Sequence, residues 1–328
     1  MKRSRQIVAL VLVVVLFAAF NLSMYQLLTR RLSNNFSGAV QAQMIDVKSY
    51  LPFEENSDLP ELEASLKLSG DLPVLDGAAA LVPVYAAVID TVYPMGCVTY
   101  EGGEFSDDNY YGENFAADSA MQYNNTLRGY QAIVDGTTGI LFCSGPSEEQ
   151  KQYAKEKGVQ LEYVPIGLEA FVFFVNEKNP IEDLTVEQIR KIYAGEYTNW
   201  SEVGGPDRVI NPVTRMEGSG SQTTFRRFMG DYEIGRKSLF AVTGASIGFS
   251  FRYYLQDIVE NDAVKMLSLD GVYPSEENIQ NGSYPVVIPF YAIYRADNDN
   301  ENIPILVDWL LSEEGQKLIE ETGYVRIK

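Results

Sequence analysis

Arg215-Met216-Glu217-Gly218-Ser219-Gly220-Ser221-Gln222-Thr223 places an arginine just ahead of a glycine-rich turn that opens a predicted helix. Ser219 is suited to cap this helix, and Gln222 completes the spacing of a capping box. The glycines let a ligand approach the backbone closely, and the first N–H groups of a helix have no partner within the helix. With the helix dipole and the arginine, these donors favour binding of a tetrahedral oxyanion. An ordinary capped helix after a loop is the alternative.

The chain has 328 residues and a net charge of -19, and its length suffices for two domains or one large bilobal domain. The charge is uneven, because residues 1–31 carry basic and no acidic side chains, so the remainder is more acidic still. A body this acidic is a poor candidate for binding nucleic acid or an anionic membrane surface. The objection applies weakly to a small anion, since local hydrogen bonds outweigh a screened distant field.

Histidine is absent, which excludes histidine-based acid–base catalysis, histidine-activated nucleophiles and histidine metal sites. Residues 244–248 match the G-x-S-x-G pattern of serine hydrolases, but without a histidine we interpret them as a turn before the aromatic stretch 249–254. Cys97 and Cys143 fit no zinc or redox spacing and are either a pair formed outside the cytoplasm or two buried thiols. We therefore expect no enzyme, no metal site and no cofactor.

The N-terminal segment 1–31 is predicted to be a signal anchor or a signal peptide. Residues 1–5 are basic, and residues 7–20 form an unbroken apolar run. A run of this length suits a signal-peptide core, whereas roughly 20 residues are needed to span a bilayer, a length that 7–28 just reaches. No small-x-small cleavage pattern directly follows Phe20. This favours an uncleaved anchor that leaves the acidic body outside the cytoplasm.

Residues 32–70 are predicted to form a polar spacer, with the folded body starting near Leu72. Beyond the spacer, predicted strands and helices alternate, which favours an α/β protein with largely parallel sheets. The expected strands are 72–75, 139–143, 161–165, 170–176 and 285–295. The expected helices are 78–93, 146–157, 185–195 and, as one helix or a pair, 303–322, while 100–126 is expected to form a surface excursion with a helix.

Several short motifs follow one another along this body. Residues 179–180, 184–189, 192–195, 198–200 and 203–205 come first, before Arg215-x-Glu217-x-Ser219-Gly220-Ser221, and 310–316 closes the series. In this order they resemble the phosphate-binding proteins of ABC-type phosphate uptake systems, from about residue 72 to 328. The resemblance implies a bilobal type II periplasmic-binding-protein fold, in which two α/β lobes are joined by two crossing strands and the anion lies in the cleft.

The resemblance also implies domain boundaries and a function. Lobe one would comprise 72–168 plus 287–328 and lobe two 169–286, with crossovers near 165–171 and 284–289. The protein would be anchored to the membrane or secreted, and would capture inorganic phosphate outside the cytoplasm for the permease of an ABC importer. Binding by lobe closure breaks no bond, and ligands of open α/β sheets do lie at helix N-termini beyond strand ends.

In the second lobe, the resemblance gives Arg215 the role of gripping the anion. Ser219, Gly220 and Ser221 would supply hydroxyl and backbone donors. A surface arginine paired with Glu217 or Asp207 is the alternative for Arg215.

In the first lobe, the resemblance places a helix N-terminus after the turn at 76–79, where only the backbone N–H groups of Ala78 and Ala79 remain as donors. Ser144 after the buried strand would add a hydroxyl, unless it simply ends the strand. Gly145 stands where the family has an aspartate that accepts the proton of hydrogen phosphate.

The missing aspartate leaves the anion open. Without that carboxylate, a fully ionised anion such as sulfate or tungstate no longer faces an unpaired acceptor. Glu217 would replace it only if it turned inward, and an exposed loop glutamate is the more ordinary outcome. The alternatives are therefore a binding protein for another tetrahedral oxyanion, or a membrane-anchored sensor or interaction module with a degenerate site.

Overall fold

The computed structural model describes residues 45–102, 114–215, 217–235, 244–258 and 263–327, together with Phe17 and Asn21. Apart from those two residues, the predicted anchor at 1–31 lies outside the described residues. Among the helices of the described ranges, none combines the length and the hydropathy required to cross a membrane.

A mixed sheet runs through the described part of the molecule, with the strand order β1-β2-β9-β3-β6-β5 and with β7 also paired to β3. The strands are β1 (Leu75–Gly77), β2 (Ile140–Ser144), β3 (Leu161–Asn176), β5 (Ile210–Pro212), β6 (Ala245–Phe251), β7 (Val264–Met266) and β9 (Val287–Arg295). A separate parallel pair joins β4 (Asp183–Leu184) to β8 (Ser268–Leu269). In the main sheet, β1–β2 and β5–β6 are parallel, whereas the pairs of β9 and β3 are antiparallel. The sheet is therefore less parallel than the alternation of elements predicts.

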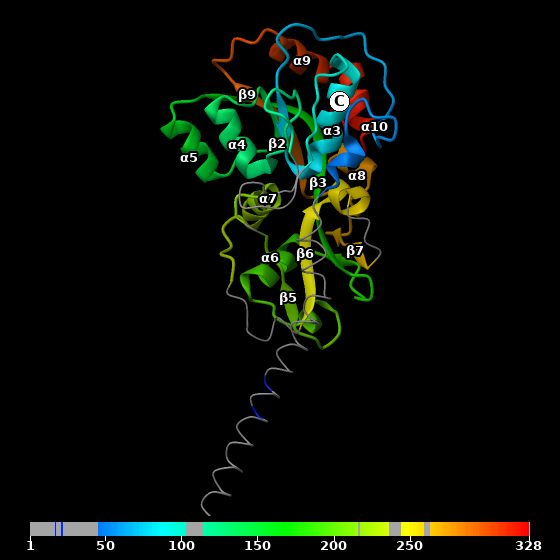
Figure 1. Cartoon of the computed structure of the whole chain (residues 1–328). Coiled ribbons are helices and arrows are strands. Elements are labelled where there is room, and N and C mark those ends of the chain that lie inside the picture. Colours follow the sequence, from blue (N-terminus) through cyan, green and yellow to red (C-terminus); the bar gives the residue numbers. More distant parts are fainter. Residues whose placement is uncertain are drawn as a thin grey trace, which may run out of the picture.

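The long strand β3 connects the two lobes of the molecule (Figure 1). Its first part pairs with β9, and its second part pairs with β6 and β7. Sequence analysis divides it into two strands, because Pro165 and Gly167 interrupt the apolar run. The backbone instead absorbs this interruption through a register shift between those two residues, and the strand continues. Residues 161–176 are thus one element that crosses from lobe to lobe beside β9.

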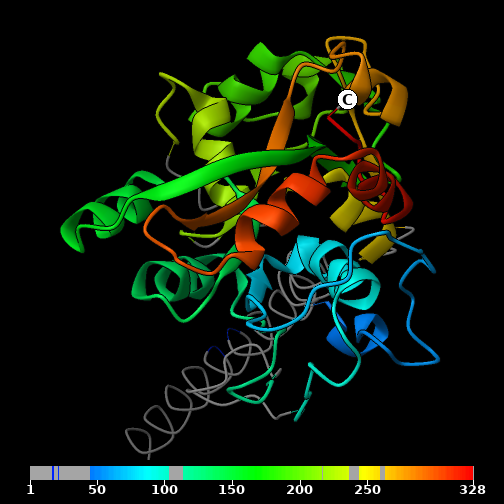
Figure 2. The same ribbon diagram turned by 90° about the horizontal axis from the view of Figure 1, so that it is seen from above.

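The described helices of the first lobe are η1 (Val47–Tyr50), η2 (Ala79–Leu81), α3 (Val82–Val92), α4 (Asn125–Asp135), α5 (Glu148–Glu156), α9 (Asn302–Leu310) and α10 (Glu313–Glu321). The predicted helix 78–93 is confirmed as η2 followed by α3, with Pro83 in the first turn of α3. The predicted helix 303–322 is a pair, and α10 packs against both α3 and β3 (Figure 2). The first core includes the buried hydrophobic residues of α3 together with Leu75 of β1 and Ile140 and Phe142 of β2.

The second lobe contains α6 (Val186–Ala194), η3 (Trp200–Val203), α7 (Gly220–Met229), the π-helical turn η5 (Tyr254–Ile258) and α8 (Glu276–Gln280). The capped helix predicted at 185–195 is confirmed, because Thr185 and Gln188 form the capping box and Gly195 ends α6 in the left-handed conformation. Its core is aromatic, with stacked Phe225 and Phe249 rings.

Two further expectations from the sequence are wrong. Residues 244–248 do not form a turn, because residues 245–248 are the first part of strand β6. In that strand, Gly248 pairs with Phe174 of β3. The packed structure also starts before Leu72, since Ile45, Val47 and Leu68 are buried in the first core. Ile45 and Leu68 lie on irregular backbone, and Val47 begins a 3-10 helix of only four residues, so no helical or strand period reveals them. Both cysteines are free thiols.

Candidate functional site

The glycine-rich motif folds into a compact loop in front of α7, at the junction between the lobes (Figure 1). Ser219 caps the helix by accepting a hydrogen bond from the backbone N–H of Gln222 at 3.2 Å. The second half of the predicted capping box is absent, because the Gln222 side chain accepts from the Arg215 backbone N–H and donates to Glu217 instead. Gln222 therefore ties the arginine to the helix that follows it.

The guanidinium of Arg215 has a buried nitrogen, Nη1, with no hydrogen-bond partner. Burial lowers the pKa of Arg215 below its ordinary value, and a hydrogen bond with the Tyr254 hydroxyl offsets part of this shift. The π-helical turn η5 begins at Tyr254 and so supports the arginine from below the loop. Buried charged donors normally find an acceptor, so the free Nη1 is the group expected to meet an anion.

The alternative interpretation of Arg215 as a surface residue paired with an acid is wrong. Glu217 accepts two hydrogen bonds from Arg226, both at 2.8 Å, and its side chain is 62% exposed. The Arg226 hydrogen bond holds the pKa of Glu217 below its usual range. Asp207 accepts from Asn199 on a different loop. Glu217 therefore faces solvent, as expected. Neither Glu217 nor Asp207 pairs with Arg215.

Ser144, at the end of β2, lies opposite the start of α7. Its Oγ is buried and has no hydrogen-bond partner. A β-carbon placed on Gly220 would lie 3.0 Å from Ser144 Oγ and 3.5 Å from Thr126 Oγ1. The fold thus brings the predicted residues Ser144 and Gly220 together from opposite lobes, and a glycine at position 220 keeps the space between them open.

The start of α4 adds residues that sequence analysis missed. Asn125 adopts the left-handed conformation, with φ of 55°, and its Oδ1 accepts from the backbone N–H of Thr126 at 2.7 Å. The buried Thr126 then faces Gly220. The run Asn124-Asn125-Thr126 is rich in capping residues and stands before an amphipathic stretch, and this is the signal that marks the helix start.

Asp76 is buried beneath this helix start and fixes its position. Its carboxylate accepts from the backbone N–H and the side-chain amide of Asn124 and from the backbone N–H of Gly77. Burial raises the pKa of Asp76, and the hydrogen bonds from Asn124 oppose that rise. The group is a structural support, because its oxygens are already occupied.

The two predicted backbone donors of the first lobe, the N–H groups of Ala78 and Ala79, differ in the hydrogen bonds that they make. The N–H of Ala78 donates to Phe142 O in the strand pairing, so the expectation that Ala78 serves a ligand is wrong. The strand β1 ends at Gly77, two residues beyond the predicted end at residue 75. The N–H of Ala79 lies 3.4 Å from Asn125 Oδ1, which is a long contact that a ligand oxygen can replace. Ser221 is buried in the first turn of α7 beside Gly220.

The position of the missing aspartate is occupied from the other lobe. A β-carbon on Gly145 would lie 3.1 Å from Nη1 of Arg227, a residue of α7. Arg227 Nη2 also donates to the backbone oxygen of Pro146. A guanidinium therefore lies where a side chain at position 145 would begin.

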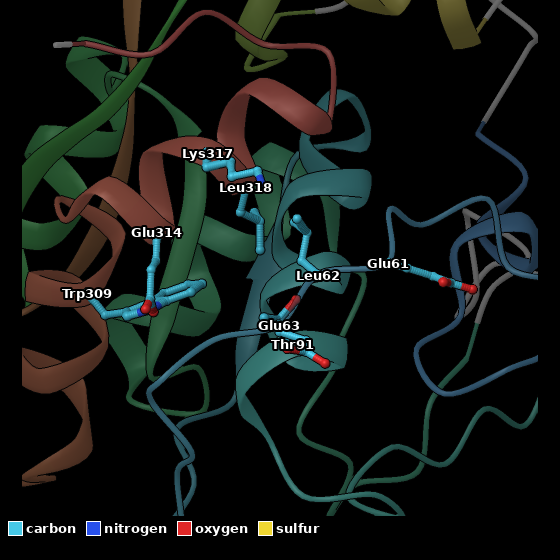
Figure 3. A pocket seen from close by; sticks show the side chains of 8 residues that line it. All are labelled: Glu61, Leu62, Glu63, Thr91, Trp309, Glu314, Lys317 and Leu318. Atoms are coloured by element: carbon cyan, nitrogen blue, oxygen red, sulfur yellow. The ribbon is translucent and has the colours of Figure 1, made fainter.

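A pocket of about 270 Å³ lies elsewhere on the first lobe, between residues 61–63, α3, α9 and α10 (Figure 3). Its charged lining consists of Glu61, Glu63, Glu314 and Lys317. It contains none of the predicted site residues, and its excess of carboxylates does not suit an anion.

Comparison with known proteins identifies relatives of the chain. A family model described as a PBP superfamily domain matches residues 107–314, more than half of the chain. The phosphate-binding protein PstS of Bacillus subtilis (strain 168) is 26% identical over 289 residues, covering 84% of this chain and 86% of the relative. Protein SphX of Synechococcus elongatus is 26% identical over 295 residues, covering 77% of this chain and 86% of the relative.

Solved structures have the same architecture. A protein from Clostridium perfringens, described as a phosphate ABC transporter substrate-binding protein and solved with bound phosphate, is 27% identical with a TM-score of 0.57. It aligns with 79% of this chain and 100% of its own. An ABC-type phosphate transport receptor from Vibrio cholerae, 22% identical with a TM-score of 0.52, aligns with 77% of this chain and 99% of its own and supports the fold alone.

Proposed function

This chain belongs to the PBP superfamily, and we propose that it is an extracytoplasmic substrate-binding protein that captures inorganic phosphate for an ABC importer. The observation that carries the proposal is the buried, unpartnered Nη1 of Arg215 beside the N-terminus of α7, opposite the unpartnered hydroxyl of Ser144. The named function of the PstS relative, and the phosphate bound to the protein from Clostridium perfringens, support the choice of phosphate.

The second lobe supplies the stronger half of the proposed site. The N–H groups of Gly220 and Ser221 lie in the first helical turn, where no intrahelical acceptor exists. Ser219 Oγ accepts from Gln222, so its own hydroxyl proton is still available to an anion. Arg215 adds a charged donor, and hydrogen bonds of this kind contribute about 1.5–3 kcal/mol each.

The first lobe closes the site from the other side. Ser144 and Thr126 offer hydroxyl groups, and the backbone N–H of Ala79 offers a further donor. Closure removes water, which strengthens every charged hydrogen bond in the cleft. Capture is reversible and breaks no bond, and reopening would release the anion to the permease. The N-terminal segment 1–31 would hold the protein at the membrane or direct its secretion.

Calorimetric titration of the full chain in detergent tests this function. We expect phosphate to bind with micromolar or tighter affinity, and Arg215→Met to abolish most of that affinity. Arsenate, sulfate and tungstate serve as competing oxyanions. Tighter binding of sulfate or tungstate than of phosphate would favour the alternative oxyanion, and an absence of heat with all four would favour a sensor or interaction module.

A further inference from the structure

The guanidinium of Arg227 reaches across the lobe boundary into the turn that follows β2. Nη2 donates to Pro146 O, and Nη1 lies against Gly145, which has no side chain to displace it. The same turn carries Ser144, whose Oγ is unpartnered. The charge of Arg227 also acts on the buried thiol of Cys143 in β2, which agrees with a guanidinium that lies near the end of that strand. A second positive charge therefore lies next to the candidate anion site.

The acids of this region are occupied by other groups. Glu217 is held by Arg226 and Gln222, and Asp76 by Asn124 and Gly77. In the described ranges, no contact places a carboxylate against Arg215 or Arg227. Two guanidinium groups thus adjoin the place where the hydroxyls of Ser144 and Thr126 face the first turn of α7. Such a site complements an anion of two negative charges better than one of a single charge.

We propose that Arg227 is a specificity-determining residue, which together with Arg215 makes the site select doubly charged tetrahedral oxyanions. Phosphate is then taken up as its dianion, and sulfate, which is also a dianion, competes with it. This inference rests on the proposed function of the same site and adds the charge state of the ligand. The carboxylate that would accept a proton from the anion is replaced by a cation that attracts a further negative charge.

The dependence of phosphate affinity on pH can show whether the site selects the dianion. It contains no histidine, so no side chain has an ordinary pKa in the range between about pH 5.5 and 8. The described groups near Arg227 are the Cys143 thiol and the turn at Gly145 with the Tyr291 ring beside it, while the acids Glu149 and Glu217 interact with the neighbouring Arg226. Burial raises the pKa of Cys143, and hydrogen bonds lower the pKa values of both acids. Their charges are therefore constant across that range, while phosphate itself gains or loses its second negative charge.

The experiment is calorimetric titration of the full chain with phosphate and with sulfate at about pH 5.5 and pH 8. We expect phosphate affinity to fall by about tenfold per pH unit below the second ionisation of phosphate, because only the dianion binds. Sulfate keeps its charge throughout, so its affinity should stay constant. Because sulfate keeps its charge, a change in sulfate affinity with pH would reveal protonation of Asp76, whose pKa is raised.

Two variants and one control test whether the selection of dianions depends on Arg227. Arg227→Gln should weaken both dianions by about tenfold and flatten the phosphate response to pH. Gly145→Asp should pair with Arg227, weaken sulfate by more than tenfold and leave phosphate less affected. Arg208→Gln removes the same charge from an exposed position before β5 and should change neither affinity.

The outcomes separate this inference from the function on which it rests. Equal phosphate affinity at both pH values in the unmodified protein, or full affinity in a folded Arg227→Gln variant, would overturn the inference and leave the binding function intact. A failure of the unmodified protein to bind any oxyanion would overturn the function itself. If circular dichroism shows that Arg227→Gln does not fold, Gly145→Asp is the test. A loss of sulfate affinity of more than about tenfold would then support the inference, and an unchanged affinity would overturn it.

Discussion

Replacing Arg215 by methionine separates a binding role from a structural role, because the two roles predict opposite effects on the folded protein. Methionine keeps most of the length of the side chain and removes the charge and its donors. In the ligand-free protein Arg215 is half-buried, its buried Nη1 lacks an acceptor, and the described side-chain contact is with Tyr254. With the proposed binding role, the arginine destabilises the free protein and is useful only when an anion is present.

The sizes of the two effects follow from this arrangement. An unsatisfied buried donor costs about 1–3 kcal/mol, and loss of the hydrogen bond to Tyr254 costs about 1 kcal/mol. Arg215→Met should therefore leave the free energy of unfolding of the ligand-free protein unchanged, or raise it by up to about 2 kcal/mol. Removing one partner of a buried charge pair costs about 2–5 kcal/mol of binding free energy. Phosphate affinity should thus fall by a factor between about 30 and several thousand.

Urea unfolding in phosphate-free buffer gives the first quantity, and calorimetric titration of the full chain gives the second. Arg208→Gln is the matched control, because it removes one positive charge from the same lobe at an exposed position. A loss of stability above about 2 kcal/mol in Arg215→Met would refute the argument. A decrease in phosphate affinity below tenfold would do so independently, since Arg215 would then be a structural residue.

Three further substitutions probe the same cleft. Ser144→Ala removes a buried, unpartnered hydroxyl, so it should weaken phosphate binding by roughly 5- to 30-fold while ligand-free stability, measured by urea unfolding, does not fall. Gly220→Ala should weaken binding at least tenfold in calorimetry, because its methyl group would lie 3.0 Å from Ser144 Oγ, yet helix α7 should be no less stable. Unchanged affinity would show that the anion lies elsewhere. Glu217→Gln should lower stability at neutral pH by less than about 1 kcal/mol, since the ion pair with Arg226 is exposed. The pKa of Glu217 is lowered in the folded state, so this difference should be present above the unfolded value of 4.5 and vanish as the pH falls through the lower folded value. A difference that persists in acid would contradict the ion-pair explanation.

Most of the regular elements could be predicted, because their signals are local. Helix α6 has a capping box, an apolar face and a terminal glycine within one short segment, and the structure places each of these features as predicted. Strand β3 is different, since Pro165 and Gly167 read as a break. Only the pairing with β9, which comes from the far end of the chain, makes one continuous strand the stable solution.

The candidate site was predictable to a smaller degree, and for the same reason. Arg215, Ser219 and Gly220 share one motif, so sequence alone groups them. Thr126 and Arg227 enter the site only because β2, α4 and α7 meet across the lobe boundary. No local pattern reports such a meeting. Ala78 shows the reverse error, because its N–H looks free in the sequence and is used by Phe142 in the sheet.

The net charge of -19 opposes the binding of an anion, and the arrangement of ion pairs explains how an anion site can still exist. Exposed acids act on the cleft through salt water, where their field decays over about 10 Å. The acid within the motif itself, Glu217, is exposed to solvent and paired with Arg226. That one ion pair contributes little to stability, yet it leaves the charge of Arg215 uncompensated. For the proposed site, anion binding therefore depends on which carboxylates are kept away from the two guanidinium groups, and hardly on how many carboxylates the chain contains.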